Sequence, residues 1–146
     1  MKKIALGSDH GGFELKEFLK KRLEENGYET EDMGCYRPDP VEYPEIAFGL
    51  AKKVVSEPES YEFGILCCGT GIGVSIAANK IKGVRAALCT DCFSARMAKE
   101  HNNANIVTFG GRTTGQELAW EMLTAFMKAE FLHGIHEPRV KALTEA

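Results

Sequence analysis

The sequence has no long apolar run. Its first apolar stretch, Ile4 to Leu6, is interrupted by Gly7, Ser8 and Asp9, which leaves it too short for the apolar core of a signal peptide. No other segment approaches the roughly 18 consecutive apolar residues of a membrane-spanning helix. We therefore expect a cytoplasmic protein that does not act at a membrane.

The chain also lacks an excess of basic residues. Its 18 Lys and Arg against 21 Asp and Glu give a net charge of −3, so no global positive field attracts nucleic acid. There are only 5 cysteines, an odd number that excludes complete internal pairing and favours free thiols. Cys89 and Cys92 form a C-x-x-C pair without the second ligand pair of a structural zinc site. We expect no metal and no cofactor, with a redox or metal role for this pair as the alternative.

No repeat, linker or low-complexity segment divides the 146 residues, so we expect one domain spanning 1–146. Apolar segments alternate with amphipathic ones. The predicted strands are 2–8, 28–34, 61–68, 84–90 and 104–110. The predicted helices are 13–27, 45–57, 73–81, 92–102 and 115–131, with a loop at 37–44 and a polar tail, 132–146, able to form a last short helix. Short apolar strands are typically buried on both faces. The alternation predicts a Rossmann-like, three-layer α/β/α fold around a five-stranded parallel sheet.

Ligands of such sheets bind at the carboxyl ends of the strands. Several chemically reactive groups follow predicted strands, and we expect them near one edge of the sheet. The same edge is expected to hold the end of the helix predicted at 92–102. These groups are Asp9 and His10, Cys68 to Thr70, Asp91, Arg112, and His101 with Asn102.

Three glycines, Gly69, Gly71 and Gly73, follow one strand and open a helix. Backbone N–H groups of such a loop can hold an anion. The dinucleotide fingerprint requires its third glycine one position later, although Asp91 lies near the expected distance for its acid. A P-loop requires Lys-Ser/Thr where Val74-Ser75 stands. A tight turn that binds nothing stays open as an alternative.

The loop is preceded by two adjacent cysteines. Cys68 lies at the strand end beside the start of a helix, a position that favours the thiolate. Successive strand residues face opposite ways, so we expect Cys67 to pack against a helix and Cys68 to line the pocket. The alternative for Cys68 is a small buried hydrophobic residue.

Six motifs together resemble one family. They are "GSDHGGFELK", "EYP", "CGTGIGVSIAANK", "GVRAALC", "ARMAKEHNNANI" and "FGGR". In this order, over nearly the whole chain, they resemble the ribose-5-phosphate isomerase type B / galactose-6-phosphate isomerase family. The resemblance implies metal-free aldose–ketose isomerisation of a phosphorylated sugar through a cis-enediolate. It also implies a homodimer with active sites shared between subunits, sometimes paired into tetramers, with the tail (about 132–146) reaching the partner.

The resemblance also implies roles for individual residues. Cys68 corresponds to the base, because Val74 stands where members without the thiol carry a glutamate. Thr70 is expected to assist proton movement at the sugar oxygens, and His101 with Asp9 to open the ring. The N–H groups from Gly69 to Ser75 would hold the enediolate oxygen. The expected substrate-binding residues are His10, Tyr43, Gly69, Gly71, Gly73, Ser75, Asn102, Arg112 and Arg139, of which His10, Arg112 and Arg139 would bind phosphate.

Each side chain also has a structural alternative. Asp9 and Asn102 could be helix caps, His101 could interact with a helix dipole, and Arg112 could form a surface ion pair.

The tail departs from the family pattern. Where the family carries G-G-R-H-x-x-R-V, this chain reads "HGIHEPRV", with Ile135 in place of the first arginine. Arg139 is retained, and His133 or His136 could compensate. Ribose 5-phosphate is the first substrate expectation. The alternatives are allose 6-, galactose 6- or tetrose 4-phosphate, or a sugar-phosphate or nucleotide binding module without catalysis.

Overall fold

A computed structural model describes all 146 residues. Five parallel strands form one sheet in the order β2-β1-β3-β5-β4. The strands are β1 (Lys3–Ser8), β2 (Thr30–Asp32), β3 (Tyr61–Cys68), β4 (Ala86–Leu88) and β5 (Ile106–Gly110). The α-helices are α1 (Phe13–Glu25), α2 (Tyr43–Ser56), α3 (Ile72–Ala78), α4 (Cys92–Glu100), α5 (Gln116–Lys128) and α6 (Glu137–Glu145). Two short 3₁₀ helices, η1 (His10–Gly12) and η2 (Gly134–His136), precede α1 and α6.

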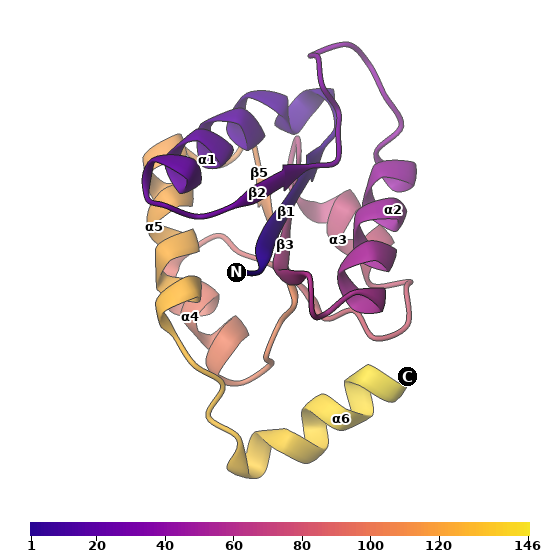
Figure 1. Ribbon diagram of the computed structural model, residues 1–146, viewed down its shortest axis with the longest axis vertical. Coiled ribbons are helices and arrows are strands. Elements are labelled where there is room, and N and C mark those ends of the chain that lie inside the picture. The colour runs from indigo at the N-terminus through magenta and orange to yellow at the C-terminus, as the bar shows by residue number, and fades with distance from the viewer.

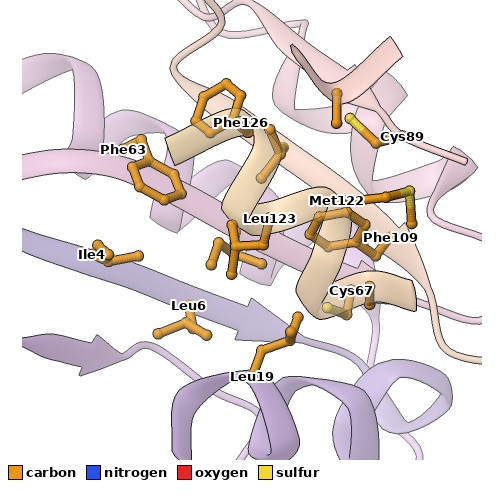
Figure 2. Packing of buried hydrophobic residues seen from close by; sticks show 14 of the residues in the cluster. Ile4, Leu6, Leu19, Phe63, Cys67, Cys89, Phe109, Met122, Leu123 and Phe126 are labelled. Carbon is orange, nitrogen blue, oxygen red and sulfur yellow. The ribbon is translucent and has the colours of Figure 1, made fainter. Parts of the chain in front are cut away.

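Helices cover both faces of the sheet, which confirms the predicted three-layer α/β/α fold. In Figure 1, α1, α4 and α5 lie on one side of the strands and α2 and α3 on the other. Each side has its own apolar cluster. Figure 2 shows the larger one, in which residues of α1 and α5 surround strand residues such as Phe63 and Phe109.

The middle strands are more deeply buried than the edge strands. In β3, seven of the eight residues are buried, whereas all residues of β2 and β4 are only half-buried. The expectation that every strand is covered on both faces was therefore wrong for the two edges. An edge strand has a neighbour on one side only, so solvent reaches it from the other.

The direction in which successive strands are added to the sheet reverses between β1 and β3. The helix after β1 leads to β2 on one side, and the helix after β3 leads to β4 on the other. Ser8 at the end of β1 pairs with Cys67 of β3. Ligands of open α/β sheets bind at such a switch point. Here it lies between the loops that follow β1 and β3, and we call this region, beside Asp9 and Cys68, the crevice.

Element boundaries differ from the expected ones mainly at the loops. Helix α2 begins at Tyr43, inside the predicted loop, because Pro44 occupies its first turn, where a missing N–H costs nothing. The predicted last helix exists as α6, and Val140 is its one buried residue. None of the helices is both long and apolar enough to span a membrane.

The Phe63–Phe126 pair provides a test of the larger cluster. The rings meet edge to face with centroids 5.1 Å apart, and Phe126 is fully buried. Phe126→Ala should lower the free energy of unfolding by about 3–5 kcal/mol, because it leaves a cavity. Leu118→Ala, on the exposed side of the same helix, should change it by less than about 0.5 kcal/mol. Urea denaturation measures both, and equal losses would contradict the assigned packing.

Candidate active site

The two adjacent cysteines face opposite sides of the sheet, as expected. Cys67 is fully buried in the cluster of α1 and α5, where Figure 2 shows it near Leu19. Cys68 belongs to the cluster of α2 and α3. Its Sγ accepts a hydrogen bond from the N–H of Gly71 at 3.1 Å. This hydrogen bond fixes the sulfur of Cys68 at the start of the glycine loop.

The glycine loop requires its second glycine. Gly71 has φ of +79°, and a Cβ there would lie 2.8 Å from the carbonyl carbon of Phe109. The hydroxyl of Thr108 donates to the Gly71 carbonyl at 2.8 Å and fixes the turn from below. The exposed Thr70 hydroxyl accepts from the N–H of Ile72 at 3.2 Å, so it helps to start α3 and also faces solvent at the crevice.

The end of β1 supplies Asp9 and His10. Asp9 Oδ1 accepts from the N–H of Gly12 at 3.1 Å, and the Asp9 N–H donates to the Cys67 carbonyl at 3.2 Å. Asp9 is therefore a helix cap, as the structural alternative predicted, and this cap holds its carboxylate beside β3. His10 is exposed, and its Nδ1 accepts from the N–H of Val41 at 3.3 Å.

Arg112 and Tyr43 lie against the glycine loop. The N–H of Arg112 donates to the Gly69 carbonyl at 2.9 Å, and Nη1 lies 3.2 Å from where a Cβ on Gly69 would stand. The guanidinium of Arg112 makes no ion pair within the chain. The structure therefore does not support the alternative in which Arg112 forms a surface ion pair. The ring of Tyr43 lies 2.7 Å from where a Cβ on Gly73 would stand. Ser75 follows in α3, half-buried.

His101 and Asn102 lie at the opposite edge of the sheet, so the expectation that they share the edge of Cys68 was wrong. Helix α4 starts at the carboxyl end of β4 and runs back to the amino end of β5. The carbonyl of Asn102 accepts from Nε of Arg85, the residue before β4, at 3.1 Å. Figure 1 shows the two edges of the sheet. The loop after β2, at the carboxyl edge, is at the top, and α6, beyond the amino edge, is at the bottom.

The amino edge carries a second cluster of predicted site residues. The imidazoles of His101 and His136 stack with centroids 4.2 Å apart and planes 14° apart. Partial burial, His101 and Arg139 all lower the pKa of His136. Sequence analysis named His136 only as a possible replacement for the arginine missing at Ile135 and did not predict this stack, which depends on how η2 folds back against α4.

Comparison with known proteins identifies the family. The family model described as Ribose/Galactose Isomerase matches residues 4–143. The chain belongs to the ribose/galactose isomerase family. Ribose-5-phosphate isomerase B of Escherichia coli (strain K12) is 42% identical to it over 144 residues, 99% of this chain and 95% of that protein. D-erythrulose-4-phosphate isomerase of Pectobacterium atrosepticum is 39% identical over 146 residues, 98% of this chain and 93% of the relative.

Solved structures agree with the sequence match. The crystal structure of a ribose 5-phosphate isomerase from Thermotoga maritima has a TM-score of 0.94 to this isomerase, at 46% identity and over 99% of each chain. The comparisons confirm the predicted resemblance, the Rossmann-like fold and the class of enzyme, an aldose–ketose isomerase acting on sugar phosphates.

Two other cysteines of this isomerase, Cys67 and Cys89, are buried in the cluster on the opposite face of the sheet from Cys68. All five cysteines are free thiols. Burial raises the pKa of Cys67 well above the ordinary thiol range and that of Cys89 to about 12, so both stay protonated at neutral pH. No group of three or more His, Cys, Asp or Glu side chains is placed to hold a metal ion.

The lowered pKa of His136 predicts a pH-dependent tail. His136 binds a proton less readily in the docked tail than in a tail released from the domain. Docking of the tail should therefore be complete above pH 6.5, the ordinary pKa of histidine, and should weaken as the pH falls below that value. Hydrogen exchange of the Leu132 N–H, which donates to the Glu100 carbonyl at 3.0 Å, measures this docking.

The His136→Asn variant is the control for this pH dependence. It should lose the dependence, whereas His133→Asn, which breaks the exposed pair with Glu137, should keep it. Protection of Leu132 that does not change between pH 8 and pH 5 in the natural chain would contradict the assignment.

Proposed function

We propose that this isomerase interconverts ribose 5-phosphate and ribulose 5-phosphate through a cis-enediolate, with Cys68 as the base. The observation that carries the proposal is the placement of the Cys68 sulfur, which accepts the Gly71 N–H at 3.1 Å inside a glycine loop at the switch point of the sheet. A base and a row of oxyanion donors in one place are what proton transfer next to a carbonyl requires.

The proposed steps assign one task to each group. His101 and Asp9 move the protons that open the sugar ring. The Cys68 thiolate removes the proton on C2, and the negative charge that develops on the carbonyl oxygen is held by N–H groups between Gly69 and Ser75. The hydroxyl of Thr70 carries a proton between the two sugar oxygens. Cys68 then returns its proton to C1, which completes the aldose-to-ketose conversion and restores the thiolate.

A complete site needs two subunits. Strand β5 runs from Ile106 to Gly110, and Gly110 pairs with Cys68. The four residue steps from Ile106 to Gly110 alone span about 13 Å. His101 lies beyond the amino end and Cys68 at the carboxyl end. We propose a homodimer in which His101, Asn102 and Arg139 of one subunit complete the crevice of the other, with the tail at 132–146 reaching across. Pairing of such dimers into tetramers stays a prediction.

Exposed apolar side chains support this assembly. Ile72 at the start of α3, Ile76 one turn further along it and Phe93 near the start of α4 are 50%, 57% and 65% exposed, and both helices start after the carboxyl end of a strand. Leu132, Ile135 and Leu143 expose similar fractions along the tail. Exposed apolar groups gathered at two separate places on a chain mark surfaces that another molecule covers, and a two-fold axis brings two different patches of identical subunits together.

The phosphate site combines groups from both subunits in this arrangement. His10 and Arg112 come from the crevice, and Arg139 comes from the partner's tail. Ile135, 69% exposed, brings no charge to this site. Allose 6-, galactose 6- and tetrose 4-phosphates are therefore the alternative substrates, the last in line with the relative that acts on D-erythrulose 4-phosphate. The five free thiols support a cytoplasmic location, where thiols stay reduced.

A substrate panel with two cysteine variants tests the chemistry. Ribose 5-phosphate should be turned over faster than allose 6-, galactose 6- and tetrose 4-phosphates in a coupled assay. Cys68→Ala should lose at least about 10²-fold in kcat, the lower range for a general base, whereas Cys67→Ala should act mainly on stability. Equal losses in kcat would show that the two thiols have been assigned wrongly. Tight nucleotide binding without turnover of any sugar phosphate would favour a binding module.

Mixing two inactive variants tests the shared site. Cys68→Ala and His101→Asn should each inactivate the homodimer. In a mixed dimer, one site carries both substitutions and the other carries neither. Random one-to-one exchange of subunits should therefore restore about a quarter of the natural activity, since half of the dimers are mixed and each has one intact site. Activity that stays at the level of the two parents would place both groups in a site within one chain.

A further inference from the structure

Lys16 is a buried charge that the proposed mechanism does not use. Its side chain is 0% exposed, and a lysine in such a place needs partners for its ammonium group. Nζ lies 2.8 and 3.0 Å from the two carboxylate oxygens of Asp32 and 3.4 Å from Glu17. Lys20 contacts the same Asp32 carboxylate at 2.9 Å, so two cations face two carboxylates. Burial alone would raise the pKa of Asp32, but hydrogen bonds from Lys16, Gly34 and Lys20 lower it below its ordinary value.

The buried pair holds the first residues after β2. Asp32 Oδ1 accepts from the Gly34 N–H at 3.0 Å, and the Lys16 ammonium donates to the Cys35 carbonyl. On their other side, the Gly34 carbonyl and the Cys35 N–H bond the backbone of Ser8 at 2.6 and 2.7 Å. This segment is therefore clamped between a buried ion pair and the end of β1, one residue before Asp9.

The same loop returns to the crevice at Val41. Its N–H donates to His10 Nδ1 at 3.3 Å, which makes Nδ1 the acceptor and places the proton of a neutral His10 on Nε2. The five residues between the two contacts include Pro38 and Pro40, which restrict the backbone. The position of Cys35 thus limits where the Val41 N–H can lie.

We propose that Lys16 and Asp32 are positioning residues whose ion pair sets the loop from Tyr36 to Val41, and through it the Nε2–H form of His10 that donates to the substrate phosphate. The role in catalysis rests on the proposed function, in which His10 binds the phosphate. Neither Lys16 nor Asp32 contacts the substrate.

The test removes the pair without leaving a lone buried charge. The double variant Lys16→Met/Asp32→Leu replaces it by apolar groups, a change that buried ion pairs often tolerate. It should raise KM about tenfold, as for one lost hydrogen bond to a charged group, and change kcat by less than about twofold. Lys20→Met is the control: it removes a cation from the same carboxylate but touches no loop residue, and KM should stay unchanged. Equal changes in KM for the two variants would overturn the proposal.

A second readout does not depend on activity. Nitrogen NMR shifts of the His10 ring should show the Nε2–H form in the natural chain and in Lys20→Met, and a mixture of tautomers in the double variant. Val41→Pro, which removes only the donor to Nδ1, should reproduce that mixture at unchanged stability. An unaltered His10 signal in the double variant or in Val41→Pro would overturn the proposal. Absence of turnover in the natural chain would instead count against the proposed function and leave this NMR comparison intact.

Discussion

The parallel pairing of β1 with β3 is the constraint on which the rest of the molecule depends. It joins two strands whose following helices turn to opposite faces, and it places the loop that starts at Asp9 against the loop that starts at Gly69. Close approach of these loops needs glycine, since a Cβ on Gly11 would lie 3.0 Å from the Gly69 nitrogen. A larger side chain there would separate the carboxylate of Asp9 from the sulfur of Cys68.

The length of a strand explains why the predicted site residues fall into two separate groups within one chain. A helix that follows a parallel strand must return to the amino edge of the sheet before the next strand begins. The residues at the end of that helix therefore lie about one strand length away from the crevice. His101 and Asn102 end α4, and the tail with His136 and Arg139 docks beside them. In the proposed homodimer, chemistry that needs both groups ties activity to assembly, and apparent stability then depends on protein concentration.

The charged side chains near the crevice divide into a buried pair that supports a loop and an exposed cation that is free to bind an anion. Lys16 and Asp32 form the most deeply buried ion pair, and it lies under the loop of the crevice instead of inside the crevice. Arg112, by contrast, makes no ion pair and is exposed at the entrance, so its charge is available to an anion. A buried pair confers position because its geometry is costly to change, whereas an unpaired surface cation can be neutralised by a ligand.

The sequence by itself determined the strand–helix alternation, the five-stranded parallel sheet and the opposite facing of Cys67 and Cys68. These follow from local periodicity and from the two-residue repeat of a strand. It also indicated that Asp9, Cys68 and Arg112 lie at one edge of the sheet, because they stand at or directly after strand ends. Only the tertiary structure decided that His101 and Asn102 lie at the far edge, that His136 stacks on His101, and that Lys16 is buried. Each of these depends on contacts between segments distant along the chain or on the direction in which a helix returns, and no local pattern of residue types encodes either.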